Sequence, residues 1–281
     1  MVENRRWLTL LTHAVLAMGV LVLAFPIWVA FVASTHELQT LLNPPMPLLP
    51  GGEFFDNYYR ALTEGARAVG APVWLMMANS LVMALGITFG KIVISMLAAF
   101  AIVYFRFRFR MFFFWMIFIT LMLPVEVRIL PTYKVVSDLG MLDNYFGLTI
   151  PLIASATATF LFRQFFMTVP DELSEAARVD GAGPMRFFKD ILFPMSRTNI
   201  AALFVILFIY GWNQYLWPLL ITTDESMYTM LIGINRMLAV GDDQAEWHII
   251  MATTMLAMLP PVAVVVLMQR LFVQGMTETE K

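Results

Sequence analysis

The sequence predicts an all-α, polytopic membrane protein with six transmembrane helices and one long cytoplasmic loop. Of its 281 residues, 60% are hydrophobic and only 14% are charged, and the mean hydropathy is +0.75. Soluble domains carry about 25% charged residues, so a water-soluble fold of this length would have to hide more apolar surface than its interior can hold. Long apolar runs and an uneven distribution of arginine and lysine support the same fold class.

Six apolar segments meet or approach the length of about 20 residues that a bilayer core about 30 Å thick requires. We place the spans at about 14–33, 80–105, 111–130, 145–162, 200–222 and 249–268, in one transmembrane domain of residues 1–281. The first span follows Arg5 and Arg6, so a signal peptide is an alternative, but its length favours a retained anchor. The second extends back to Val73 and contains Lys91. Because no turn signal divides it, we predict one long helix.

The basic residues predict that both termini are cytoplasmic, because cytoplasmic flanks of membrane spans are enriched in lysine and arginine. With the N-terminus inside, twelve basic residues lie on the cytoplasmic side and five outside. The twelve are Arg5, Arg6, Arg106, Arg108, Arg110, Arg163, Arg178, Arg186, Lys189, Arg197, Arg270 and Lys281, and the five are Arg60, Arg67, Arg128, Lys134 and Arg236. This topology makes 163–199 the one long cytoplasmic loop and leaves 34–72 and 224–248 outside.

The cytoplasmic loop contains the signals of a short helix between Pro170 and Gly181. Proline fits the first turn of a helix, and the acids Asp171 and Glu172 that follow it favour the positive end of the helix dipole. Gly181 fits a helix end that needs a left-handed residue.

The predicted helix has a small apolar face, because Leu173, Ala176 and Ala177 fall at helical spacing. Such a helix is suited to a groove in another protein, and a helix lying on the membrane surface fits the residues equally well. A second short helix is predicted to begin at 183–184 and to stop at Pro194.

The loop resembles the EAA loop of the membrane subunits of ABC importers. The motif reads Glu175-Ala176-Ala177, then Gly181, then Ile191-x-Phe193-Pro194, and only Phe193, more often leucine in that family, departs from the pattern. In the family this loop carries the coupling helix, which docks into a cleft of the ATPase subunit. The resemblance implies an ATPase-coupling role for Glu175, Ala176, Ala177, Asp180 and Gly181.

The resemblance extends along nearly the whole chain. Residues 211–218, GWNQYLWP, are similar to the fifth-helix signature of the carbohydrate-importer branch, which includes the maltose permease. Residues 114–128, 154–166 and the Trp212 segment resemble the permeases of bacterial sn-glycerol-3-phosphate importers. This implies import of that phosphate and related glycerophosphodiesters through half of a shared pathway. An importer of sugars or oligosaccharides is the alternative.

The same resemblance implies the partners and the location. The partners are a second homologous permease, two copies of an ATP-binding subunit, a periplasmic substrate-binding protein and the lipid bilayer of the bacterial inner membrane. ATP and Mg would be used by the partner ATPase, and this chain would hold no cofactor of its own.

The sequence lacks the residues of several other functions. Gly86 to Gly90, with Lys91 and Ile92, only approximates a phosphate-binding loop, since the glycine spacing is short by one and the hydroxyl residue is replaced. It is better interpreted as a close-packing helix face. There is no cysteine, the three histidines are scattered, so no metal site is predicted, and a net charge of −2 excludes a strongly basic nucleic-acid binder.

Four polar residues are candidates for the solute pathway. Lys91, deep in a span, either attracts a substrate phosphate or makes a structural contact between subunits or snorkels. Arg128 either guides an anion or pairs with Glu126. Asn213 and Gln214, predicted within the fifth helix, bond either solute hydroxyls or neighbouring helices.

Two further classes of membrane protein fit the sequence less well than an importer. An ion-coupled carrier predicts inverted repeats or acidic residues at mid-membrane, and the spans hold neither clearly. A purely structural anchor leaves the cytoplasmic loop unexplained.

Overall fold

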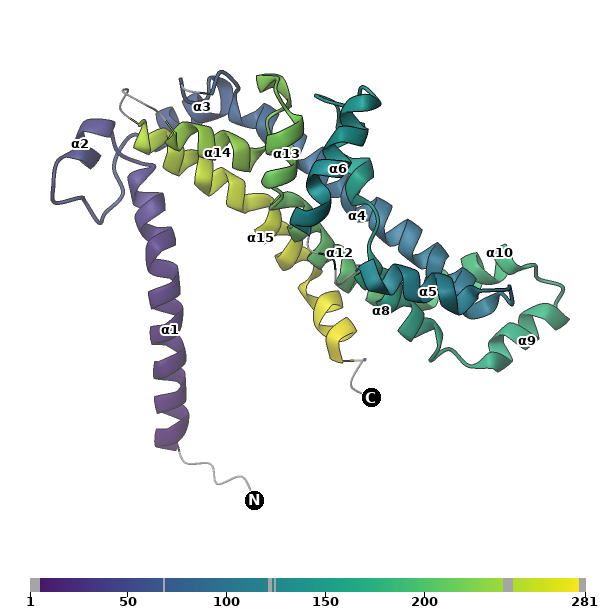
Figure 1. The fold of residues 1–281 in the computed structure, drawn as a ribbon. Helices are drawn as coiled ribbons and strands as arrows, with labels where there is room; N and C mark the ends of the chain where they lie inside the picture. The colour runs from purple at the N-terminus through teal and green to yellow at the C-terminus, as the bar shows by residue number, and fades with distance from the viewer. Residues whose placement is uncertain (1–5, 68, 121–122, 124, 240–244, 278–281) are drawn as a thin grey trace. The chain divides into compact units, whose positions relative to one another are not determined.

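The computed structural model describes residues 6–67, 69–120, 123, 125–239 and 245–277, and these residues form helices and turns without any β-strand. The all-α prediction is thus confirmed for the described residues (Figure 1). The helices are α1 (Arg6–Ala33), α2 (Leu38–Leu42), α3 (Phe54–Thr63), α4 (Val73–Tyr104), α5 (Arg110–Ile119), α6 (Val125–Asp138), α7 (Tyr145–Thr149), α8 (Ala156–Phe166), α9 (Asp171–Val179), α10 (Pro184–Phe187), α11 (Phe193–Met195), α12 (Arg197–Trp212), α13 (Leu216–Ile221), α14 (Met230–Leu238) and α15 (Trp247–Thr277). Single 3₁₀ turns cover Ile150–Leu152 and Glu225–Met227, and a π-helical turn covers Phe188–Leu192.

Three described helices, α1, α4 and α15, are long and apolar enough to cross a membrane. Two bent pairs bring the total to as many as five: α7 with its 3₁₀ turn is bent by 50° from α8, and the α10–α11 segment by 72° from α12. The predicted span 111–130 falls on α5 and α6, whose junction includes residues outside the described ones. That sixth crossing stays a prediction.

Helix α4 is continuous through Lys91, which confirms that this run is one helix and not two spans. Its glycines provide a close-packing face. A Cβ atom at Gly86 would lie 2.8 Å from Cγ2 of Thr149, and one at Gly90 would overlap the side chain of Ile153. Because only glycine leaves this space, α4 approaches the 149–153 segment closely, as the glycine spacing predicted.

The chain divides into two compact units, which we describe separately. The first comprises Met1–Leu75 and Gly233–Leu259. Within it, Glu246 pairs with Arg60 of α3 and also accepts a hydrogen bond from the backbone N–H of Arg67 at 3.0 Å. Burial alone would raise the pKa of Glu246, but the Arg67 hydrogen bond and the Arg60 charge hold it below its ordinary value.

The second unit comprises Met76–Ile232 and Pro260–Lys281 and contains two groups of buried apolar side chains. One packs the end of α4 against α8, α9 and α10, and it includes Phe100, Phe162, Ala177 and Phe187. The other packs the middle of α4 against α6, α7 and α13, and it includes Ile87, Ile129, Leu148 and Trp217.

A hydrogen-bonded group, here called the Asn79 cluster, joins α4 to α7 and to the segment after α13. Its members are Asn79, Ser80, Tyr145, Ser226, Tyr228 and Met230. The side-chain amide of the fully buried Asn79 donates to the carbonyls of Ser226 at 2.8 Å and Tyr228 at 3.0 Å. The Tyr145 hydroxyl donates to Oδ1 of Asn79 at 2.6 Å, and the Met230 N–H donates to Oγ of Ser80 at 2.8 Å.

Candidate coupling site and solute pathway

The predicted short helix of the cytoplasmic loop is confirmed as α9. It begins directly after Pro170, with Asp171 and Glu172 in its first turn, as the helix dipole favours. Gly181, just past its end, has φ +72°, so the predicted left-handed position is also confirmed. A Cβ at Gly181 would meet no atom within 4 Å, so only the backbone conformation selects glycine there.

The apolar residues of α9 do not all face the same way, which corrects the prediction of one shared face. Ala177 is only 6% exposed and belongs to the buried group at the end of α4, whereas Ala176 and Leu173 are exposed. Successive helix residues are about 100° apart, so Ala177 turns inward while Ala176 stays outside. Val179, at 88% exposure, is the apolar side chain that sequence reasoning missed, because it lies off the predicted face.

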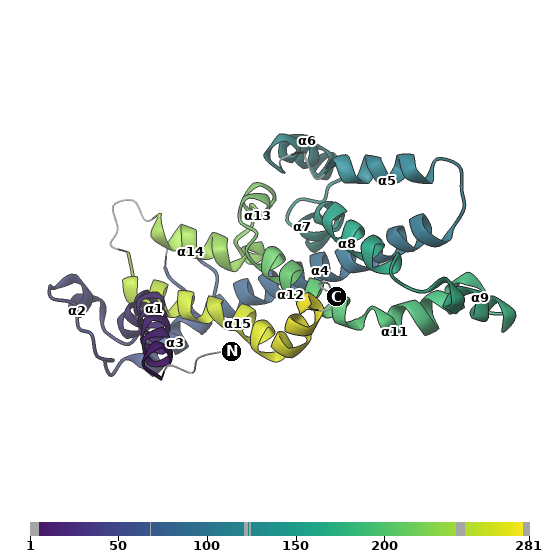
Figure 2. The same cartoon turned by 90° about the horizontal axis from the view of Figure 1, so that it is seen from below.

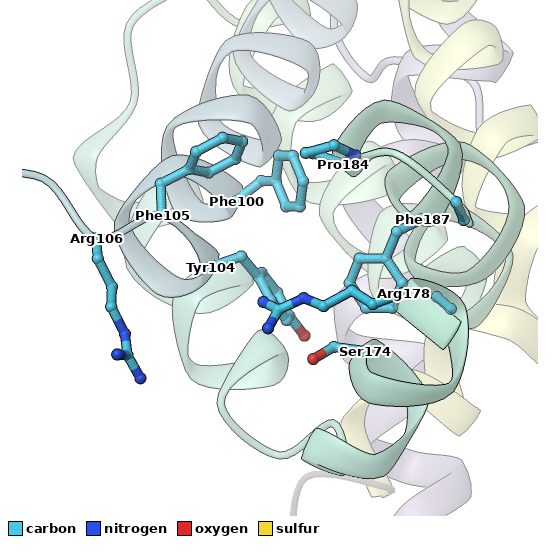
Figure 3. A pocket seen from close by; sticks show the side chains of 10 residues that line it. Phe100, Tyr104, Phe105, Arg106, Ser174, Arg178, Pro184 and Phe187 are labelled. Carbon is cyan, nitrogen blue, oxygen red and sulfur yellow. The ribbon is translucent and has the colours of Figure 1, made fainter. Parts of the chain in front are cut away.

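The acidic residues of α9 are directed outward. Glu175 and Asp180 are exposed, and within the described part of the chain no ion pair joins Glu175 to Arg178, the intrahelical partner suggested by their spacing. Arg178 instead lines a cavity and extends toward Tyr104 of α4 (Figure 3). The Glu175 carboxylate therefore remains available to a cation on another subunit.

The cavity between the end of α4 and the α9–α10 loop has a volume of about 240 Å³. Four of its ten lining residues are aromatic, two are arginines and one is a serine: Phe100, Tyr104, Phe105, Arg106, Ser174, Ala177, Arg178, Ala182, Pro184 and Phe187. In Figures 1 and 2, α9 lies beyond the end of α4 from which the chain leads to α5. No sequence pattern predicted this cavity, because its walls come from segments far apart in the chain.

The second loop helix ends at Met195, one residue after the stop predicted at Pro194, and Pro194 itself lies inside its last turn. The helix continues from α10 through the π turn and α11 to Met195, and the chain then changes direction at Ser196. Proline lacks an N–H and crowds the preceding turn of an α-helix. The wider π turn just before Pro194, in which the Phe193 N–H donates to the carbonyl of Phe188, relieves that crowding.

Lys91 is buried inside the chain. It is 6% exposed, and its Nζ lies 3.7 Å from the ring centroid of Tyr210 on α12, a cation–π contact. Snorkelling, in which the ammonium would reach the interface, is therefore not what the structure contains. The structural contact that Lys91 makes here is within one subunit.

Asn213 and Gln214 lie in a break between α12 and α13, and not within a continuous fifth helix as predicted. Pro218 explains the break: in a continuous helix it would have no N–H for the carbonyl of Gln214 and would crowd it. The Gln214 side chain donates to the carbonyl of Tyr210 at 3.1 Å, whereas Asn213 is exposed.

Arg128 is an exposed residue of α6. The side chain of Glu126, its suggested partner, lies outside the described side chains. The four pathway candidates thus differ in their surroundings: Lys91 contacts the ring of Tyr210, and the Gln214 side chain donates to the backbone carbonyl of the same residue.

Comparisons with known proteins agree on the class of the chain. Residues 91–278 match the family described as binding-protein-dependent transport system inner membrane component. The sn-glycerol-3-phosphate transport system permease proteins UgpE of Escherichia coli K12 and of Shigella flexneri serotype 5b are each 59% identical over 281 residues, covering 100% of both chains.

A solved structure is similar over almost the whole chain. It is a bacterial ABC transporter involved in the import of the acidic polysaccharide alginate, with a TM-score of 0.81 and 20% identity, and the alignment covers 96% of this chain and 98% of that one. At this identity the likeness shows the fold. Fold and family model together lead to one conclusion: the chain belongs to the family of inner membrane components of binding-protein-dependent transport systems, the permease subunits of ABC importers.

Proposed function

We propose that this chain forms half of the translocation pathway of an ATP-driven importer of sn-glycerol 3-phosphate and related glycerophosphodiesters. The observation that carries the proposal is 59% identity over the full length to permeases named for that substrate. The alginate importer supports the fold and not the substrate, because only 20% of the aligned residues are identical. Import of a sugar or oligosaccharide is the competing outcome of the test below.

The proposed assembly contains a second homologous permease, two ATP-binding subunits and a periplasmic substrate-binding protein, with ATP and Mg bound by the ATPase partner. Both termini of this chain would be cytoplasmic. Helix α9 would dock on the ATPase through its outward side. The exposure of Glu175, Ala176, Val179 and Asp180 supports this role.

The proposed solute pathway includes the break between α12 and α13. Helix breaks inside membrane proteins are tolerated where they line a cavity or are buried in protein, and the exposed amide of Asn213 can bond a solute hydroxyl there. Arg128 would attract the anion at the start of α6. Lys91 would meet a phosphate only after separating from Tyr210, and Gln214 would chiefly hold the break.

Uptake in a strain without other routes tests the substrate. Deleting this chain should abolish uptake of labelled sn-glycerol 3-phosphate and leave maltose uptake intact, and the plasmid-borne chain should restore it. Unchanged phosphate uptake together with a fall in uptake of a sugar would replace this substrate by the alternative.

Charge reversal tests the coupling role. Glu175→Lys should leave the protein in the membrane and reduce both binding-protein-stimulated ATP hydrolysis and uptake in proteoliposomes that contain all partners. Asp138→Lys, an equal charge change at the exposed end of α6, is the matched control. Full stimulated hydrolysis by an assembled Glu175→Lys complex would refute the assignment of α9.

A further inference from the structure

The segment between α4 and α5 alternates phenylalanine with arginine. The six exposed residues, here called the Phe-Arg strap, are Phe105, Arg106, Phe107, Arg108, Phe109 and Arg110. The strap begins directly after α4, a helix long and apolar enough to cross a membrane. Its composition is typical of a boundary between hydrocarbon and water, where aromatic rings favour the headgroup level and arginines favour anionic groups.

The strap holds an unusual backbone conformation that keeps one ring outside. Phe109 has φ +68°, in the left-handed region that bulky residues rarely adopt, and its ring is 62% exposed. The guanidinium carbon of Arg108 lies 5.1 Å from the centroid of that ring. A membrane surface can accept the exposed ring and the cation together, because amphipathic groups bury their apolar parts and keep the charge at the polar level.

The cavity described above opens beside the strap and shares residues with it. Arg106 and Phe105 of the strap line the cavity together with Arg178 and Ser174 of α9 and Tyr104 of α4. In Figure 3, Arg178 and the Ser174 hydroxyl extend toward Tyr104, while the Arg106 side chain leads away from the aromatic wall. Among the described residues that line it there is no carboxylate, and the nearby charge of Asp171 acts on Tyr104 from outside the lining. Arg178 and Arg106 are therefore the two charged residues of the lining, and both are cations.

We propose that the cavity and the Phe-Arg strap together bind an anionic phospholipid, with its phosphate at Arg106 and Arg178 and its glycerol and upper acyl carbons against the rings of Phe105 and Phe100. Arginine is suited to phosphate because its planar donors contact two oxygens at once. A free phosphate would use the cations but not the aromatic walls or the exposed rings of the strap. The composition of the strap therefore favours the lipid as the source of the phosphate.

The bound lipid would contact both α4 and α9. Its effect on transport rests on the proposed coupling role of α9, because holding Arg178 and Tyr104 on one headgroup would fix α9 relative to the end of α4. Lipid binding itself does not depend on that role, so the two ideas can fail separately.

Lipid retention by the purified complex is the direct test. Native mass spectrometry of the full complex with phosphatidylglycerol, phosphatidylcholine or inorganic phosphate should show preferential retention of phosphatidylglycerol. Arg106→Gln and Arg178→Gln should each weaken retention about fivefold, and the double variant roughly 25-fold, as expected for single arginines at an anionic surface. Arg270→Gln, an exposed arginine that does not line the cavity, is the matched control and should retain the lipid.

The possible outcomes distinguish a lipid from a free phosphate as the ligand, and the lipid site from the coupling role of α9. Equal loss in Arg270→Gln, or no preference for phosphatidylglycerol over phosphatidylcholine, would overturn the site. Displacement by millimolar inorganic phosphate in the wild type would assign the cavity to a free anion and also overturn the lipid proposal. If the double variant does not assemble, the Arg106→Gln retention decides alone. Normal lipid retention with a defective Glu175→Lys complex leaves this inference standing whatever the transported solute proves to be.

Discussion

The Asn79 cluster and helix α9 lie in the same compact unit and are held in opposite ways. Asn79 is fully buried, and its side-chain amide makes three hydrogen bonds to two other segments. Helix α9 has one buried residue, Ala177, and most of its other side chains are exposed. The Asn79 cluster satisfies its buried polar groups within the chain, whereas α9 exposes most of its side chains and can bind a partner.

The difference indicates which region is stabilised by contacts within the chain alone and which region has surface available for another subunit. A buried, satisfied polar group specifies one arrangement, since each lost bond leaves a costly unpaired group. Helix α9, which has one buried alanine and ends at a left-handed glycine, makes few such contacts, so its position can change when another subunit binds it. The following predictions test that contrast, beginning with the largest expected effect on stability.

Gly147→Ala should have the largest effect on stability among the substitutions compared below. A Cβ there would overlap the backbone carbonyl oxygen of Met141, and the carbonyl of Gly147 accepts the indole N–H of Trp217 at 3.0 Å. Because backbone must move, we expect a loss of about 3 kcal/mol, measured by thermal unfolding in detergent. Gly183→Ala, with open space around its Cβ, is the control; equal melting temperatures for the two variants would contradict the packing argument.

Asn79→Ala should lower stability by about 1–3 kcal/mol. It leaves the Tyr145 hydroxyl and two carbonyls without their partner in a buried site. Chemical denaturation in micelles measures the change, with the exposed Asn235→Ala as the control. A double variant with Tyr145→Phe should lose less than the sum of the two single losses, and strict additivity would mean that the pair is not coupled.

Asp143 should add a small acid-dependent contribution near the same end of the unit. Burial alone would raise its pKa, but hydrogen bonds from the Thr223 hydroxyl and from the N–H groups of Asp224 and Thr223 hold the pKa below its ordinary value. A carboxyl with a lowered folded pKa stabilises the fold above its unfolded pKa and loses that contribution as pH falls through the folded value. The melting temperature should therefore drop below about pH 4, and less so in Asp143→Asn. Parallel profiles would contradict this.

Gly181→Ala should have the smallest effect on stability. Its Cβ meets no atom, so the cost is the left-handed conformation alone, about 1 kcal/mol. If α9 docks on the ATPase, stimulated ATP hydrolysis by the whole complex should fall by more than the loss of folding stability accounts for. A melting temperature reduced as much as in Gly147→Ala would mean that α9 is not the adjustable region.

Sequence reasoning was accurate where a local signal decides the backbone. The Pro170 start, the Gly181 end and the continuity of α4 through Lys91 follow from helix dipoles, φ preferences and hydropathy, and each is confirmed. The close approach at Gly86 and Gly90 was also predictable, because small residues one turn apart leave room for a neighbour.

Sequence reasoning failed where distant segments decide the outcome. Pro194 is accommodated by a π turn, which its local sequence does not specify. Asn213 and Gln214 fall in a break caused by Pro218, four residues after Gln214, although hydropathy favours a continuous helix there. The partner of Lys91, Tyr210, is 119 positions away in the chain, and no pattern pairs them.

The length of α4 has a mechanical consequence. Its 32 residues give a rod about 48 Å long, well beyond a hydrocarbon core of about 30 Å, so it must lean or project into water. Asn79 sits near one tip and Tyr104 at the other, about 38 Å apart. Rings of the loop that carries α10 rest on that second tip, with Phe187 against Tyr104 and Phe188 against Phe100 at centroid distances of 5.2 and 5.0 Å. A displacement of this loop would therefore be transmitted along α4, whose other end is held by the hydrogen bonds of the Asn79 cluster.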